Sequence, residues 1–126
     1  GVKAAMPEKS VVSIIGDGGF MFAMPALASA VQHNIGVVTV VFNNNSFGNV
    51  RRDQKDRFQS HIIGADLTNP DFLKIADSFG VEGYRVASPK EFKPALIKAI
   101  DQDQPAIIEV QIEKDSETNP WKYIHG

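Results

Sequence analysis

Short apolar runs recur along the chain and predict four β-strands. Each run is rich in β-branched residues and lies between glycine, proline or polar residues, as strands usually do. The runs are 11–15 (VVSII), 37–42 (VVTVVF), 81–86 (VEGYRV) and 106–112 (AIIEVQI). The first is predicted to be a buried strand. The second, apolar except for Thr39, is predicted to be a parallel strand covered on both faces.

Helical spacing and cap residues predict helices between these strands. The first helix has Pro25 in its first turn and ends near His33. Ser88 and Glu91 form a capping box for the last helix, which ends near Ile100. Two further helices are predicted between them. Residues 50–58, with charges of both signs, form an exposed helix, and residues 69–79 form a helix that begins at Asn69-Pro70-Asp71.

Strands and helices therefore alternate, apart from one helical insert after the second strand. This order predicts an α/β domain with a mainly parallel sheet and right-handed crossovers. No internal repeat or linker interrupts it, so residues 1–126 are predicted to form a single domain. The polar and then aromatic stretch 113–126 is expected to be a tail that leaves the domain.

Composition excludes several classes of protein. The 126 residues are 43% apolar and 22% charged, which suits a soluble globular domain. A net charge of −2 with both signs interspersed lacks the basic footprint of a nucleic-acid-binding protein. The absence of cysteine excludes disulfides and thiolate metal sites, and it suits a reducing compartment such as the cytoplasm. No apolar run approaches the roughly 18 residues of a membrane-spanning helix.

Two polar motifs follow the first two strands directly. Gly16-Asp17-Gly18-Gly19 ends the first strand, and Asn43-Asn44-Asn45-Ser46 ends the second. Because ligands of open α/β sheets bind beyond the carboxyl ends of the strands, Asp17 and Asn44 are predicted to be near neighbours. Carboxylate and amide oxygens suit Mg²⁺ or Ca²⁺, and Mg²⁺ completes its shell with water and phosphate oxygens. The pair therefore predicts a cation that clamps a diphosphate approached by glycine N–H groups.

Each motif taken alone has a simpler explanation. A single GDG after a strand is more often a plain turn, and an asparagine run is usually turn chemistry, because asparagine tolerates left-handed backbone. The argument for a site comes from finding both motifs at the ends of consecutive strands joined by one helix.

GDG followed some two dozen residues later by NN resembles the signature of thiamine-diphosphate-dependent enzymes. The chain from Val11 to Ile112 is similar to the C-terminal cofactor-binding domain of the acetolactate synthase and 2-oxoacid decarboxylase family. The similar segments are VVSIIGDGGFMF, ASAVQHNIGVVTVVFNNNSFGNVR, NPDFLKIADSFGVEGYRV and QPAIIEVQIE, in that order. The resemblance implies a doubly wound α/β fold with helices on both faces of the sheet.

The resemblance also implies roles for individual residues. Mg²⁺ would be bound by the Asp17 carboxylate, the Asn44 side-chain oxygen and the Ser46 backbone carbonyl. Thiamine diphosphate would contact the two motifs and the residues after them, namely Gly16, Asp17, Gly18, Gly19, Phe20, Asn44, Ser46, Phe47, Gly48, Asn49 and Val50. Gly18 and Gly19 would line the diphosphate, while Phe20 and residues 47–50 would lie near the two rings. Many relatives have serine in place of Gly19, and acetolactate synthases often have methionine in place of Asn49.

In the family that this chain resembles, a glutamate from a separate pyrimidine-binding domain hydrogen-bonds the pyrimidine ring of the cofactor and so starts its activation. No segment of this chain resembles that domain. The chain is therefore expected to be a fragment of a longer synthase or decarboxylase, or a subunit whose partner supplies the glutamate. The start at Gly1, within the apparent end of a helix, favours the fragment. A 2-oxoacid substrate and association at least as a dimer are implied, and this chain alone would have at most weak activity.

Other candidate residues have ordinary explanations. His33 is expected at a helix end, His61 in a solvated loop and His125 in the tail. Arg51 and Arg52 follow the second motif closely but belong to a run with both signs, which favours an exposed helix face. Trp121 and Tyr123 are candidates for contact with a partner.

Two other functions remain open at this point. A nicotinamide-binding domain would need a third glycine after G-x-G, and Asp53 lies too far along to bind a ribose. A non-enzymatic assembly module of doubly wound fold gives the NN run no role, but fold alone does not exclude it.

Overall fold

The fold is built on a four-stranded sheet in which all neighbouring strands are parallel, in the order β1-β2-β4-β3. The computed structural model describes residues 1–118 and 121–124. The strands are β1 (Val11–Gly16), β2 (Val37–Asn43), β3 (Glu82–Val86) and β4 (Ala106–Gln111). All four strands predicted from the sequence are therefore confirmed, with their ends shifted by one residue at most.

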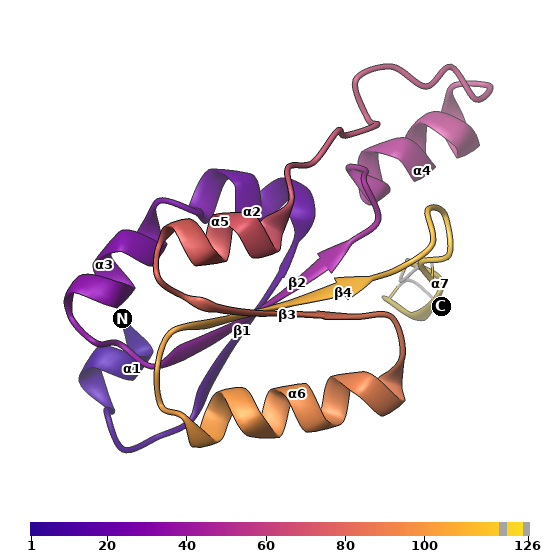
Figure 1. Ribbon diagram of the computed structural model, residues 1–126. Coiled ribbons are helices and arrows are strands. Elements are labelled where there is room, and N and C mark those ends of the chain that lie inside the picture. The colour runs from indigo at the N-terminus through magenta and orange to yellow at the C-terminus, as the bar shows by residue number, and fades with distance from the viewer. Residues whose placement is uncertain (119–120, 125–126) are drawn as a thin grey trace.

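Helices cover both faces of the sheet (Figure 1). One face carries α2 (Asp17–Ala23), α3 (Ala26–Gln32) and α5 (Phe72–Ser78), and the other carries α6 (Pro89–Asp101). The remaining helices are the short α1 (Val2–Ala5) and α7 (Trp121–Ile124), and α4 (Gly48–Arg57), which projects beyond the carboxyl ends of the strands. This arrangement confirms the doubly wound α/β fold. No helix in the described ranges is long and apolar enough to span a membrane.

Two apolar layers hold the helices against the sheet. On the α5 face, Phe20 and Phe72 meet edge to face with ring centroids 5.3 Å apart, above Val41 and Ile107. On the α6 face, Ala99 packs with buried residues of the three strands β2, β3 and β4, including Val40, Val86 and Ile108. Side chains of β2 and β4 alternate between the two layers, which explains why both strands are almost continuously apolar.

The capping predictions are confirmed. The Asp71 carboxylate accepts a hydrogen bond from the Leu73 N–H at the start of α5. The Ser88 hydroxyl accepts from the Glu91 N–H at the start of α6, and the Glu91 carboxylate in turn accepts from the Ala87 N–H. The predicted helix ending near His33 is α3, with Pro25 as its N-cap. The separate helix α2 was not predicted, because two of its seven residues are glycines, which have low helix propensity.

Two expectations are wrong, one about the burial of β1 and one about the path of the C-terminal segment. β1 was predicted to be buried, but it lies at the edge of the sheet, and the side chain of Ile14 is 73% exposed. The segment 113–118 was expected to leave the domain, but it folds back onto α4. Asp115 there forms ion pairs with Arg51 and Lys55 at 2.9 and 2.6 Å. The sequence missed this return because each pair joins residues about sixty positions apart.

Candidate functional site

A cavity of about 210 Å³ lies beyond the carboxyl ends of β1 and β2. Asp17, Asn44 and Ser46 all line it, so the predicted convergence of the two polar motifs is present in the structure. Other parts of the wall come from the end of β2, the start of α4 and the C-terminal segment. The complete lining is Gly16, Asp17, Phe42, Asn44, Ser46, Gly48, Asn49, Arg52, Ile112 and Glu117.

Asp17 is the first residue of α2, and only 2% of its surface is exposed. One carboxylate oxygen accepts a hydrogen bond from the Gly18 N–H at 2.9 Å. The other accepts from the side-chain amide of Asn69 at 2.6 Å. These two bonds fix the carboxylate at the cavity wall, and each oxygen keeps a further lone pair for a ligand.

Asn69 is a site residue that the sequence did not identify. Its amide nitrogen lies within 3.3 Å of three acceptors, which belong to Asp17, Asn43 and Asn45. It thereby joins the motif after β1 to the motif after β2. The sequence signal was the run Asn69-Pro70-Asp71, which was interpreted only as the start of a helix. The role of Asn69 depends on a contact 52 positions away in the chain.

The polar contacts continue beneath the cavity across the sheet. Asn43 donates to one carboxylate oxygen of the buried Glu109 at 2.7 Å, and Arg85 on β3 donates to the other at 2.7 Å. Arg85 also donates to Asp71 at 2.7 Å. Hydrogen bonds to Glu109 and then Asp71 raise the pKa of the Arg85 guanidinium, and the bond from Arg85 lowers the pKa of the Asp71 carboxyl. A carboxylate within an otherwise apolar strand was the available signal for this network.

Hydrogen bonds within the turn after β2 fix the shape of the second polar motif, residues 43–46. The Asn44 side-chain oxygen accepts from the Ser46 N–H at 3.0 Å, as in an Asx turn. Asn45 has a φ of 55°, a left-handed conformation that asparagine tolerates. Both Asn44 and Ser46 are buried. Turn chemistry and site placement are thus combined in the same residues.

Two glycines permit close packing beside the cavity. A Cβ on Gly18 would lie 2.7 Å from Cδ1 of the Phe47 ring, so the ring packs directly on the Gly18 backbone. A Cβ on Gly48 would lie 3.0 Å from Oε1 of Glu117 and 3.2 Å from Nδ2 of Asn44. Gly48 therefore lets the C-terminal segment approach the second motif.

Several residues that the resemblance placed near the cofactor do not line this cavity. The Phe20 ring is buried in the apolar core against Phe72, because residues 17–23 form a helix that turns it inward. Val50 lies on an exposed face of α4, and Gly19 packs beside Ile15. The Gly18 N–H, expected to face a diphosphate, is hydrogen-bonded to Asp17.

Ion pairs fix the outer wall of the cavity. Arg51 on α4 bonds to Asp66 and Asp115, while Lys114 bonds to Asp66 at 2.8 Å. Hydrogen bonds from Lys55 and then Arg51 lower the pKa of the Asp115 carboxyl. The bond from Lys114, followed by the charge of Arg51, lowers the pKa of the Asp66 carboxyl. Both acids thus remain ionised at neutral pH, and the C-terminal segment stays against α4.

Of the other candidates, Arg52 lines the cavity, whereas His33, His61 and Tyr123 do not. His33 follows α3 and is exposed, and His61 is exposed in the loop after α4. His125 lies outside the described residues. Tyr123 is largely exposed on α7. None of these observations gives a histidine a role at the cavity.

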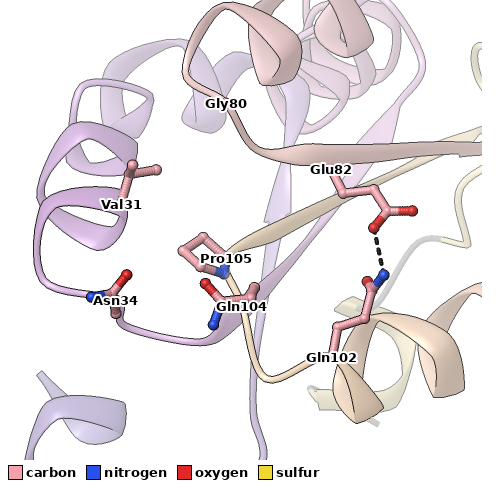
Figure 2. Close-up of a pocket in the computed structure, with 7 residues that line it drawn as sticks. All are labelled: Val31, Asn34, Gly80, Glu82, Gln102, Gln104 and Pro105. Carbon is pink, nitrogen blue, oxygen red and sulfur yellow. Dashed lines mark hydrogen bonds between the residues drawn. The ribbon is translucent and has the colours of Figure 1, made fainter.

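A larger hollow of about 360 Å³ lies at the opposite end of the sheet, near the starts of β3 and β4. Figure 2 shows its lining, in which Glu82 is the single ionisable side chain and accepts a hydrogen bond from Gln102 at 2.6 Å. Hydrogen bonds from Tyr84, Lys98 and Gln102 lower the pKa of Glu82 to about 2. Because Glu82 already has these partners, the chemistry favours the smaller cavity at the carboxyl ends of the strands.

Comparison with known proteins gives consistent matches to one family. Residues 1–110 match the model of the thiamine pyrophosphate enzyme, C-terminal TPP binding domain. The mitochondrial acetolactate synthase catalytic subunit of Aspergillus candidus is 41% identical over 90% of this chain and 16% of its own length. The pyruvate oxidase of Lactiplantibacillus plantarum is 37% identical over 90% of this chain and 19% of its own.

A solved structure agrees with these matches. The thiamine diphosphate-dependent 4-hydroxybenzoylformate decarboxylase of Rhodococcus jostii RHA1 superposes with a TM-score of 0.84 and 34% identity. The match covers 91% of this chain and 22% of that protein. This chain thus spans about a fifth of the length of the relatives named here. The matching sequence, the parallel sheet and the polar cavity at its carboxyl edge together show that the chain belongs to the thiamine pyrophosphate enzymes, as a C-terminal TPP-binding domain of the acetolactate synthase and decarboxylase family.

Proposed function

We propose that this chain binds thiamine diphosphate through Mg²⁺ and serves as the diphosphate-binding part of a 2-oxoacid decarboxylase or an acetolactate-synthase-like carboligase. The observation that carries the proposal is the convergence of Asp17, Asn44 and Ser46 on one cavity. The family match supports the cofactor, and the donor chemistry supports the metal.

The residues at the cavity fit a magnesium ion. Asp17 supplies a buried negative charge, and Asn44 keeps a lone pair on its side-chain oxygen after accepting from Ser46. With the Ser46 carbonyl, these are three hard oxygen donors, and Mg²⁺ takes its remaining ligands from water and phosphate. No cluster of three or more histidine, cysteine or acidic side chains occurs in the described part of the chain. Water and phosphate oxygens would therefore complete the shell.

This chain's own residues would bind and orient the cofactor. The metal at Asp17 and Asn44 would hold the diphosphate, while Gly48 and Asn49 form the adjoining wall. When bound, the cofactor supplies the reactive thiazolium carbon that attacks a 2-oxoacid. Asn69 holds the Asp17 carboxylate in position before any ligand arrives.

A second domain completes the proposed enzyme. The relatives named above are an acetolactate synthase, a pyruvate oxidase and a decarboxylase, and this chain matches only about a fifth of each. A separate pyrimidine-binding domain or subunit would supply the catalytic glutamate, in an assembly at least dimeric. Ile14 on the edge strand β1 and Phe22 on α2 are 73% and 83% exposed. They support such a partner, because parallel sheets are normally covered and exposed apolar patches mark interaction surfaces.

Calorimetric titration with thiamine diphosphate tests the proposal. Binding to the 126-residue chain is expected with Mg²⁺ present and is expected to disappear in excess chelator. The metal should be required because a polyanion would otherwise face the buried Asp17 carboxylate without a cation between them. Equal binding with and without the metal would contradict the proposed clamp.

Replacing Asn69 by alanine should weaken Mg²⁺–thiamine diphosphate binding by about 10–100-fold, the usual effect of removing a group that orients a metal ligand. The reason is that Asp17 would lose its 2.6 Å hydrogen bond and become free to rotate. Calorimetry measures the effect. Gln32→Ala, an exposed amide at the end of α3, provides the matched control. Unchanged affinity in Asn69→Ala would show that Asp17 needs no such support.

A further inference from the structure

Glu109 is a buried carboxylate between two apolar neighbours on β4, Ile108 and Val110. Only 2% of its surface is exposed, and it lines neither of the two cavities described above. Its two oxygens accept hydrogen bonds at 2.7 Å, one from Arg85 Nε and the other from Asn43 Nδ2. A buried ion pair usually stabilises a fold no better than apolar residues of the same volume. The effect of Glu109 on its neighbours is therefore of more interest than its contribution to stability.

Glu109 determines which way the side-chain amide of Asn43 faces. An asparagine amide that is turned end for end keeps its shape but exchanges a donor for an acceptor. A carboxylate only accepts, so the NH₂ group of Asn43 faces Glu109 and its oxygen faces away. That oxygen accepts from the Asn45 N–H at 3.1 Å and from the Asn69 NH₂ group at 2.9 Å. The orientation of Asn43 is thus fixed on both sides.

The orientation is passed from Asn43 to Asn69 and then to the proposed metal ligand Asp17. The Asn69 NH₂ group donates to Asn43 at 2.9 Å and to Asp17 at 2.6 Å, so its two hydrogens serve two acceptors. If Asn43 were turned, its NH₂ group would face that of Asn69, and two donors form no hydrogen bond. Asn69 would turn in response and present its oxygen to the Asp17 carboxylate, which repels it. The acceptor at Glu109 therefore controls, through two amides, whether Asp17 is held.

We propose that Glu109 is a positioning residue for the metal site, which sets the orientation of the Asn43 and Asn69 amides so that Asn69 donates to Asp17. The inference deepens the proposed function and rests on it, because the ligand that is positioned is the one assigned to Mg²⁺. Glu109 itself contacts neither the metal nor the cofactor, and it takes no part in proton transfer.

Glu109→Gln tests the proposal, because it keeps the shape of the side chain and changes only the pattern of donors and acceptors. Arg85 is only a donor, so the introduced amide turns its oxygen to Arg85 and its NH₂ group to Asn43. Binding of Mg²⁺–thiamine diphosphate should weaken about tenfold, the lower end of the effect of removing a group that orients a metal ligand. Calorimetry on the 126-residue chain measures it. Glu113→Gln, the same substitution at an exposed residue after β4, should bind normally.

A second substitution should rescue the first. Asn43→Asp combined with Glu109→Gln exchanges the acid and the amide, so the new carboxylate accepts both from the introduced amide and from Asn69. Affinity should return to within about threefold of the parent chain, because residues in one hydrogen-bond network are energetically coupled. Asn43→Asp alone places a second carboxylate opposite Glu109 and should bind no more tightly than the parent chain. Tighter binding by that variant would assign the rescue to added charge and overturn the inference.

Nuclear magnetic resonance tests the orientations without the cofactor. In the ¹⁵N,¹³C-labelled parent chain, couplings across hydrogen bonds should join Asn43 Nδ2 to the Glu109 carboxyl carbon and Asn69 Nδ2 to the Asp17 carboxyl carbon. Glu109→Gln should abolish the coupling to Asp17, and the double variant should restore it. A loss of stability alone would not be reversed by exchanging the acid and the amide.

Absence of both couplings from the folded parent chain would overturn the inference, as would unchanged affinity in Glu109→Gln. If Glu109→Gln does not fold, the couplings in the parent chain decide, and a folded double variant that binds about tenfold more weakly counts against the inference. Failure of the parent chain to bind thiamine diphosphate with Mg²⁺ contradicts the proposed function instead. The couplings are measured without the cofactor, so the two failures are distinguishable.

Discussion

Replacing Asp17 by alanine should lower the affinity of the chain for Mg²⁺–thiamine diphosphate by about 100-fold or more. Loss of a group that merely orients a metal ligand already costs about 10–100-fold, so loss of the charged ligand itself should reach at least the upper end. The side chain is buried at the cavity wall, where Gly18 and Asn69 hold its two carboxylate oxygens. Titration calorimetry with saturating Mg²⁺ measures the change.

Further variants separate charge from shape at this position. Asp17→Asn keeps the acceptor oxygen and removes the charge, so its affinity should lie between those of the parent chain and Asp17→Ala. Asn44→Ala should also lose most of the binding. Asp77→Ala, which changes an exposed acid on α5, should bind normally. Tight metal-dependent binding by Asp17→Ala would mean that the cation lies elsewhere.

Replacing Phe72 by alanine should lower the free energy of unfolding by about 3–5 kcal/mol, the usual cost of removing a buried phenylalanine ring. Phe72 is 0% exposed and contacts Phe20 between α5, α2 and the sheet. Its removal leaves a cavity in the layer that holds both helices. Urea denaturation followed by circular dichroism measures the loss.

Phe58→Ala is the matched control for this experiment. Phe58 is 62% exposed at the end of α4, so its removal should change the free energy of unfolding by no more than about 0.5 kcal/mol. Equal effects of the two substitutions would mean that the α5 layer contributes little to stability. A domain of this size is typically stable by about 5–15 kcal/mol. A loss of about 3–5 kcal/mol therefore leaves a folded population whose unfolding by urea can be measured.

The apolar pattern was sufficient to predict all four strands, because parallel strands buried on two faces leave uninterrupted apolar runs. It could not reveal that β1 lies at an edge. The run VVSII is as apolar as β2, and its exposure depends on which strands pair with it. Likewise, the division between α2 and α3 follows from Pro25, which lacks an N–H and cannot continue a helix, yet the glycines disguised the first of the two helices.

The candidate site was predictable where its residues follow strand ends. Asp17 and Asn44 were found because the edge of a parallel sheet brings consecutive strand ends together. Arg52 and Glu117 line the cavity from a helix and from the C-terminal segment, and Asn69 bonds to Asp17 from a loop. The paths of these segments are set by tertiary contacts such as those of Arg51. No local pattern encodes those paths. The cofactor-facing roles of Phe20 and Val50 came from the family resemblance; in this structure the Phe20 side chain lies in the apolar core and Val50 is exposed on α4.

The buried polar network running from Arg85 through Glu109, Asn43 and Asn69 to Asp17 has a consequence for engineering. It fixes the angle of the Asp17 carboxylate by a relay that starts on the outermost strand, β3, on the side of the sheet farthest from β1. Redesign of that distant strand, even with every cavity-lining residue kept, is expected to alter cofactor affinity. Libraries aimed at new substrates should therefore hold Arg85 and Glu109 constant while the cavity wall is varied.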